Sequence, residues 1–205
     1  MNRWLAYVKI GFGLLAVSAI VTEIFVLVDR GVFDFVNFFS YFTVESNLFA
    51  AIILLVGGYY MLKKQTLSSR FNWLWGAATL YMVITGIIFS LLLAGLENVA
   101  LTAVPWDNTV LHYIMPVAVA GLWLIDPPKQ TLSYIKSLSW ILFPLGYGAY
   151  TWIRGAIVGW YPYPFMNPEV SGISGLIAVS VGITVGSALL GWLLVWRANY
   201  SAKLA

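Results

Sequence analysis

Long apolar runs constrain this chain more than any other feature of its sequence. Six stretches each approach or exceed the roughly 20 mainly apolar residues that a helix needs to cross a bilayer. They cover about residues 4–28, 35–62, 71–94, 108–125, 138–158 and 172–196. Because 61% of the residues are hydrophobic and only 9% are charged, we expect an all-α integral membrane protein. The links are short, so residues 1–205 are expected to form a single transmembrane domain of six helices.

The basic residues indicate how these helices are oriented. Cytoplasmic loops of membrane proteins carry an excess of Lys and Arg, and this bias sets the topology. Nine of the eleven basic residues fall on one side of the predicted bundle, namely Arg3, Lys9, Lys63, Lys64, Arg70, Lys129, Lys136, Arg197 and Lys203. We therefore expect both termini on the cytoplasmic side of the cell (inner) membrane. Basic residues this sparse and scattered do not indicate a nucleic-acid partner.

Cysteine and histidine usage limits the available chemistry. The sequence has no cysteine and one histidine, His112. Disulfides, thiolate nucleophiles and the usual zinc sites are therefore excluded, and we expect neither a metal nor a cofactor. His112 stands out for the same reason, since a neutral imidazole is the natural general base near pH 7.

Polar side chains inside the predicted helices gather at one level, in the outer halves of the helices. Ionisable and polar groups are costly at membrane depth, and their presence there predicts function. Four helices contribute such residues: Glu23, then Thr43, Glu45, Ser46 and Asn47, then Asn108 and His112, and finally Tyr147, Tyr150, Thr151 and Arg154. We expect a polar site that faces the extracytoplasmic side.

Helical spacing places several of these residues on shared faces. Thr43 and Asn47 are four residues apart and Ser46 is three from Thr43, so the three share one face. Asn108 and His112 share a face by the same spacing. A helix-interior proline clashes with the carbonyl four residues earlier, so Pro116 predicts a kink at His112.

These residue types fit acyl transfer. A threonine hydroxyl is a weak nucleophile unless a base takes its proton, so we expect His112 to activate Thr43. A developing oxyanion needs hydrogen-bond donors, for which the candidates are Asn47, Asn108 or a tyrosine hydroxyl such as that of Tyr150, with Ser46 in support. Structural alternatives remain open, because Thr43 can bond back to its own helix and His112 can simply link two helices.

Arg154 and Glu23 are the charged members of the group. A guanidinium stays protonated, so at membrane depth Arg154 needs a counter-charge or an anionic ligand. We expect Arg154 to meet the Thr43 face, where it can bind a substrate carboxylate, or to form a structural ion pair with Glu23. The sequence leaves open whether Glu23 pairs with Arg154 or with His112.

Three blocks of the sequence resemble known membrane proteins. The blocks are Tyr41-Phe42-Thr43 with Ser46-Asn47-Leu48, Trp106-Asp107-Asn108 through His112 to Pro116, and Tyr147 through Arg154-Gly155 to Tyr161-Pro162-Tyr163-Pro164-Phe165. They resemble a bacterial family of six-helix membrane proteins. More distantly, the chain is similar to the eukaryotic androgen-induced and androgen-dependent membrane hydrolases, which are multi-pass threonine hydrolases of fatty acid esters of hydroxy fatty acids.

The resemblance implies roles for a few residues. Thr43 matches the nucleophile and His112 the base, whereas the matching Tyr163-Pro164-Phe165 element carries no assigned role. Ser46-Asn47 and Arg154 depart from the eukaryotic pattern, so the same substrate is not implied. The implied partner is a lipid or fatty-acyl ester, bound by a monomer or small homo-oligomer in the bilayer.

Two other functions compete with this interpretation. A lipid- or small-molecule-binding protein or transporter would use Glu23, Glu45, His112 and Arg154 as a polar relay, and a polar path to the cytoplasmic side would favour it. Residues 172–175 read Gly-Ile-Ser-Gly, as in rhomboid proteases, but there the serine helix precedes the histidine helix. Gly182 and Gly186 form a GxxxG pattern, which we expect to serve internal helix packing.

Overall fold

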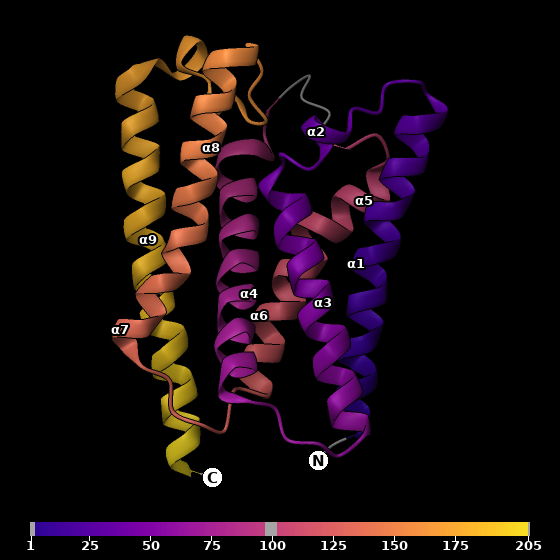
Figure 1. Ribbon diagram of the computed structural model, residues 1–205, viewed down its shortest axis with the longest axis vertical. Coiled ribbons are helices and arrows are strands. Elements are labelled where there is room, and N and C mark those ends of the chain that lie inside the picture. The colour runs from indigo at the N-terminus through magenta and orange to yellow at the C-terminus, as the bar shows by residue number, and fades with distance from the viewer. Residues whose placement is uncertain (1–2, 97–101, 205) are drawn as a thin grey trace.

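The computed structural model describes residues 3–96 and 102–204, which form helices and their connections without any strand. The long helices run alongside one another, and the short helices α2 and α5 lie toward one end (Figure 1). Five helices in this described part are long and apolar enough to cross a membrane. The expectation of an all-α chain with several helices able to cross a membrane is confirmed.

Two helices form one flank of the bundle. α1 (Arg3–Asp29) packs along α3 (Phe42–Leu62). Small buried residues face each other here, with Ala16 and Ala19 on α1 and Ala50 and Ala51 on α3. Small side chains let two backbones approach closely, which compensates for the missing hydrophobic drive between helices in lipid.

The centre of the bundle contains two helices interrupted by wider turns. α4 (Ser69–Ile88) continues into a π-helical turn, η1 (Phe89–Leu93). α5 (Pro105–Thr109) leads through a second π-helical turn, η2 (Val110–Ile114), into α6 (Met115–Ile125). Such π turns inside helices are frequent at functional sites.

The opposite flank consists of the C-terminal part of the chain. α7 (Tyr134–Ser137) and the 3₁₀ turn η3 (Leu138–Ile141) lead into α8 (Leu142–Val158). The 3₁₀ turn η4 (Pro164–Met166) precedes α9 (Pro168–Leu204), which is kinked at Gly172. In Figure 1, α8 and α9 stand together on the side away from α1. α8 has only 17 residues, so it is shorter than each of the five candidate membrane spans, which with their π-helical turns have at least 21 residues.

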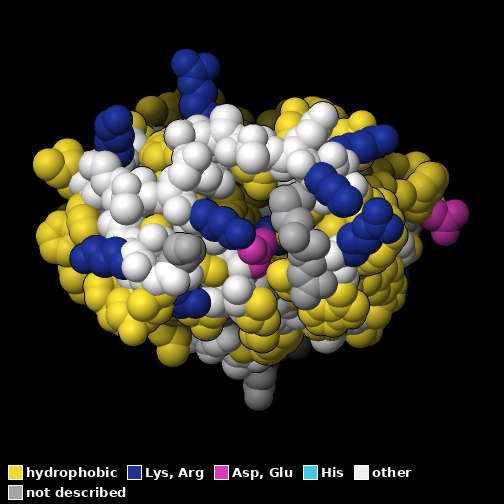
Figure 2. Space-filling view, turned by 90° about the horizontal axis from the view of Figure 1, so that it is seen from below, with side chains coloured by type: hydrophobic (Ala, Val, Ile, Leu, Met, Phe, Trp, Pro, Cys, Tyr) yellow, Lys and Arg dark blue, Asp and Glu magenta, His cyan; other side chains and the backbone are white. Residues whose placement is uncertain are grey.

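The two chain ends lie at the same end of the bundle (Figure 1). Figure 2 views the molecule from that end, and Lys and Arg side chains are spread over the face that it shows. Basic side chains are therefore numerous at the end of the molecule that carries both termini.

The predicted helix over residues 35–62 is broken in the structure. α2 (Phe35–Phe38) is capped by Asp34, whose Oδ1 accepts a hydrogen bond of 2.7 Å from the Asn37 amide. Ser40 then donates its hydroxyl to the Val36 carbonyl at 2.6 Å, and α3 begins only after Tyr41. These local side-chain bonds compete with helix continuation. As a result, Thr43 lies in the first turn of α3 and not within a long helix.

Two further local expectations concern Pro116 and the Gly182–Gly186 pair, and only the second is corrected. Pro116 lies in the first turn of α6, directly after the π-helical turn η2 that carries His112, so the chain widens there. A side-chain carbon added to Gly182 or Gly186 would meet no atom within 4 Å beyond its own helix. This glycine pair therefore makes no close internal contact with the described part of the bundle.

Candidate active site

Thr43 and His112 meet in the bundle. The Thr43 Oγ1 atom lies 3.2 Å from His112 Nε2, although 69 residues separate them in sequence. Thr43 comes from the first turn of α3 and His112 from the π-helical turn η2. Both are almost fully buried, with exposed fractions of 7% and 4%. The pairing expected from the sequence is therefore geometrically present.

A backbone carbonyl defines the proton position on His112. The Nδ1 atom lies 3.2 Å from the carbonyl oxygen of Asn108, which can only accept a hydrogen bond. In the neutral imidazole Nδ1 therefore carries the proton, and Nε2 can accept a hydrogen bond from the Thr43 hydroxyl. The Phe89 ring stacks on the imidazole at 4.1 Å between centroids, which restricts the plane of the ring. This arrangement points His112 Nε2 at the Thr43 hydroxyl.

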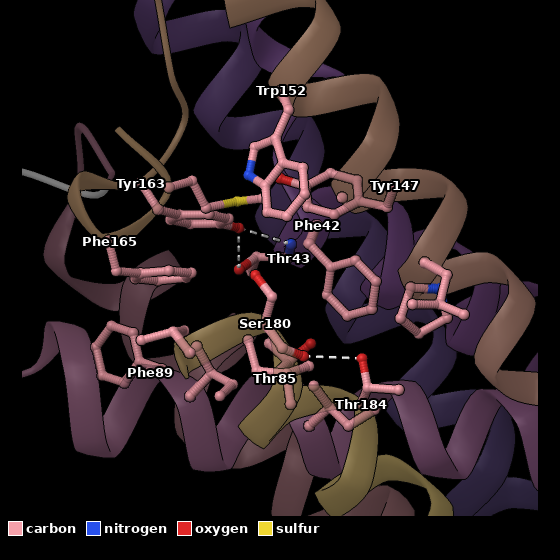
Figure 3. Close-up of a pocket in the computed structure, with 18 of the residues that line it drawn as sticks. Phe42, Thr43, Thr85, Phe89, Tyr147, Trp152, Tyr163, Phe165, Ser180 and Thr184 are labelled. Carbon is pink, nitrogen blue, oxygen red and sulfur yellow. Dashed lines mark hydrogen bonds between the residues drawn. The ribbon is translucent and has the colours of Figure 1, made fainter. Parts of the chain in front are cut away.

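Tyr163 is the second side chain at the Thr43 hydroxyl. Its OH lies 3.3 Å from Thr43 Oγ1 and accepts a hydrogen bond of 3.2 Å from the Thr43 amide (Figure 3). That amide needs such a partner because the first turn of a helix leaves its N–H groups unpaired. Tyr163 lies in the connection between α8 and α9, where burial raises its phenol pKa to about 12. The phenol therefore stays protonated at neutral pH, and it can donate to Thr43 Oγ1 when Thr43 donates to His112 Nε2.

Asn47 and Ser46 hold the backbone at Thr43 and do not reach its hydroxyl. The Asn47 amide donates to the Thr43 carbonyl at 2.9 Å and to the Leu111 carbonyl at 3.1 Å. It thus ties α3 to the π-helical turn that carries His112. The Ser46 hydroxyl lies 3.2 Å from the Thr43 carbonyl and 2.9 Å from Thr85 Oγ1. Both residues lie next to the predicted site, where Asn47 links α3 to η2 and Ser46 links α3 to α4.

Two cavities meet at Thr43. One, of about 190 Å³, is largely apolar and is lined by residues including Thr43, Ile88, Leu145, Trp152, Tyr163 and Ile183. We call it the apolar cavity, and Figure 3 shows the side chains around it. The other, of about 270 Å³, is also mostly apolar, but Glu23, Arg30 and His112 line it together with Thr43, Ala103 and Tyr163. We call it the polar chamber because of these side chains. Thr43 and Tyr163 line both cavities, whereas His112 lines the polar chamber.

Glu23 pairs with neither of its two expected partners. Both of its carboxylate oxygens accept hydrogen bonds from the Ala103 amide, at 2.7 and 3.0 Å. Arg30 donates to the Ala103 carbonyl at 3.3 Å. Glu23 and Arg30 thus both bond the backbone of Ala103, which lines the polar chamber.

Arg154 and Tyr150 lie apart from Thr43. Arg154 Nη2 donates to Asn37 Oδ1 at 2.6 Å, and its guanidinium lies 5.0 Å from the ring centroid of Trp160. The Tyr150 hydroxyl lies 2.8 Å from Ser40 Oγ. Both residues therefore fix the break between α2 and α3. The expected contact of Arg154 with the Thr43 face is absent, and Arg154 lines neither of the two cavities described here.

Tyr163 is the functional candidate that residue spacing missed. It lies outside the predicted helices, and no periodic pattern links it to Thr43 across 120 residues. Its Tyr-Pro-Phe block was the one available signal, through the resemblance alone. Asn108 is a partial success, because its backbone carbonyl, and not its side chain, bonds His112.

No protein-family model, no curated protein and no solved structure matches this chain. Ser174, the serine of the Gly-Ile-Ser-Gly block, is exposed on α9 and lines neither cavity. Nothing in the described geometry favours Ser174 over Thr43 as a nucleophile.

Proposed function

We propose that this protein is an intramembrane threonine hydrolase that cleaves a lipid ester. One observation carries the proposal: Thr43 Oγ1 lies 3.2 Å from His112 Nε2, where an apolar cavity and a polar chamber meet. A nucleophile next to an oriented base is the arrangement that acyl transfer requires. The apolar cavity fits an alkyl chain, and the polar chamber fits the ester oxygen and water.

The reaction has two steps. His112 Nε2 takes the hydroxyl proton while Thr43 Oγ1 attacks the ester carbonyl carbon. The tetrahedral intermediate collapses, the alcohol leaves with the proton from Nε2, and the acyl group stays on Thr43. In the second step His112 takes a proton from water, the water oxygen attacks the acyl-threonine, and Thr43 regains its proton as the fatty acid departs.

Two groups support this chemistry. The Asn108 carbonyl holds the proton on His112 Nδ1, as the third member of a catalytic triad does, but without a full negative charge. Tyr163 directs a hydroxyl proton toward the place where Thr43 attacks, so it is positioned to donate to the developing oxyanion. Thr43 also lies at the N-terminus of α3, where the helix dipole favours negative charge.

The proposed topology has six spans. α8, extended by η3 and α7, would be the sixth, and both termini would lie in the cytoplasm of a cell whose inner membrane holds the protein. The spread of Lys and Arg over the end that carries the termini supports this orientation. Thr43 would then open toward the extracytoplasmic half, and a fatty acid ester of a hydroxy fatty acid is the substrate type that the sequence resemblance implies.

The test is hydrolysis by the full chain purified in detergent, with p-nitrophenyl butyrate and a fatty acid ester of a hydroxy fatty acid as probes. Thr43→Ala is expected to abolish turnover, and His112→Ala to lower it by at least about 10²-fold, the lower range for loss of a general base. Thr79→Ala is the matched control, because Thr79 is also buried but bonds back to the Trp75 carbonyl at 2.9 Å. Unchanged turnover in Thr43→Ala refutes the proposal.

A covalent probe separates hydrolysis from simple lipid binding. A fluorophosphonate that reacts with activated hydroxyl groups should label Thr43 in the native chain, as seen by peptide mass, and fail to label the His112→Ala variant. A lipid-binding protein or transporter would bind the ester without turnover and without a Thr43 adduct. That result would favour the polar-relay alternative.

A further inference from the structure

The apolar cavity follows α8 and α9 over a considerable length. Its lining residues on α8 run from Pro144 to Trp152, which at 1.5 Å per residue is about 12 Å along the helix axis. On α9 the lining residues are Val179, Ser180, Ile183 and Thr184, a spacing that places them on one helix face. The cavity is therefore elongated along two neighbouring helices, as a site for an extended chain would be.

The two α9 hydroxyl groups in this cavity donate to carbonyl groups of their own helix. Ser180 Oγ donates to the Leu176 carbonyl at 2.7 Å, and Thr184 Oγ1 donates to the Ser180 carbonyl at 2.8 Å. Such back-bonding within a helix hides the polarity of a hydroxyl. The face of α9 that lines the cavity thus behaves as an apolar wall, which favours an alkyl chain over a polar ligand.

The cavity is open on the side that would face lipid. Leu145 and Ala149 of α8 both line it and are both exposed, Leu145 by 48%. In a bilayer, exposed apolar side chains at this depth contact lipid acyl chains. A chain can therefore pass from the bilayer into the cavity beside α8 without crossing water.

His112 determines which half of the ester lies where. It lines the polar chamber and not the apolar cavity, while Thr43 lines both. The departing alcohol must receive the proton of Nε2, so it has to lie on the His112 side. The acyl group bonded to Thr43 then extends to the other side.

We infer that the apolar cavity binds the acyl chain of the ester, which arrives sideways from the bilayer beside α8 and contacts Ile183 of the α9 wall. The alcohol part and the hydrolytic water occupy the polar chamber. This inference rests on the proposed hydrolase function, and it assigns the two cavities their separate roles.

The test compares two tryptophan variants on the same helix. Ile183→Trp fills the cavity, whereas Val181→Trp adds the same bulk at a position that is 56% exposed and lines neither cavity. The measured quantity is kcat/KM for p-nitrophenyl palmitate relative to p-nitrophenyl butyrate, for the full chain in detergent. Ile183→Trp should lower this ratio by about 10-fold or more, since several methylene groups lose their burial site. Val181→Trp should leave it within about 2-fold.

Thermal unfolding in detergent shows whether Ile183→Trp is folded, and its own butyrate rate is the reference for its palmitate ratio. If Ile183→Trp is folded and its palmitate ratio matches that of Val181→Trp, the acyl-site assignment is wrong while the hydrolase proposal stands. Should Ile183→Trp not fold, Ile183→Ala serves instead, with an expected rise of the palmitate ratio above that of the native chain. An unchanged ratio in Ile183→Ala then overturns the assignment.

A binding measurement is independent of turnover. A photoreactive palmitic acid, irradiated with the Thr43→Ala variant, should crosslink to peptides of α8 and α9 around Leu145 and Ile183. If these peptides are labelled but the native chain hydrolyses no ester, the chain-binding site stands and the hydrolase proposal is wrong. Crosslinks confined to other helices would overturn the site itself.

Discussion

Replacing Tyr163 by Phe removes a single oxygen from the centre of the site. The ring keeps its surroundings, since it stacks on Phe165 at 5.3 Å with an interplanar angle of 4° and meets Tyr41 edge-on at 5.7 Å. The variant loses the hydrogen bond from the Thr43 amide, at 3.2 Å, and the contact with Thr43 Oγ1, at 3.3 Å. The substitution therefore tests the hydroxyl and leaves the packing intact.

The two lost contacts have separate consequences. The Thr43 amide is left buried without its partner, which typically costs about 1–3 kcal/mol of folding free energy. Losing one donor to an oxyanion costs about 10²–10³ in kcat, or about 3–4 kcal/mol in the activation barrier. Because burial raises the Tyr163 pKa to about 12, the phenol is protonated throughout the neutral range, and the rate deficit should not vary between about pH 6 and pH 8.

The assay combines steady-state hydrolysis of p-nitrophenyl butyrate with thermal unfolding in detergent. Tyr81→Phe is the matched control, because the Tyr81 hydroxyl is also buried and donates to the Trp140 carbonyl at 2.9 Å, away from Thr43. Both variants should unfold at lower temperature, but only Tyr163→Phe should lose kcat. A Tyr163→Phe enzyme with kcat within about 3-fold of native would refute its role as oxyanion donor, since that loss is far below the expected range.

Two further predictions concern the supports of the fold. Asn47→Ala removes the amide that donates to both the Thr43 and the Leu111 carbonyl. The free energy of unfolding should therefore fall by about 1–3 kcal/mol, and the rate of hydrolysis should fall with it. A variant as stable and as active as the native chain would contradict this. Asp126→Asn leaves Lys9 buried without the counter-charge that now lies 2.6 Å away. The free energy of unfolding should therefore fall by about 3 kcal/mol, which is the lower part of the range for buried pairs because the Asp126 side chain is 26% exposed. Hydrolysis below the unfolding temperature should be unaffected, and an unchanged denaturation midpoint would argue against a stabilising role of the pair.

The long helices were predictable because their cause is local in the sequence. A run of apolar residues that crosses a bilayer finds no water there, so its backbone N–H and C=O groups must bond to one another, and a helix pairs them internally. Thr43 and His112 were found because polar groups at membrane depth are rare, so two of them at one level tend to meet. Their distance of 3.2 Å agrees with that expectation.

The errors have equally local causes. The break between α2 and α3 depends on the side chains of Asp34 and Ser40, which apolar periodicity ignores. Arg154 was expected to face Thr43 because both lie at one level, yet its guanidinium bonds Asn37. The membrane depth of a residue and its helix face do not determine which neighbouring segment supplies the hydrogen-bond partner of a charged side chain.

Tyr163 shows why part of this site lies beyond any reading of helix spacing. α8 ends at Gly159, which has a positive φ of 70° that ends the helix, and the chain then turns back. Gly155 makes room for this return, because a side-chain carbon there would lie 2.1 Å from the ring of Tyr161. Tyr161 can thus pack flat against α8, and the chain two residues later reaches Thr43. The position of the Tyr163 hydroxyl therefore depends on a helix end and a missing side chain in α8, and a larger residue at Gly155 would displace the donor without touching Thr43 or His112.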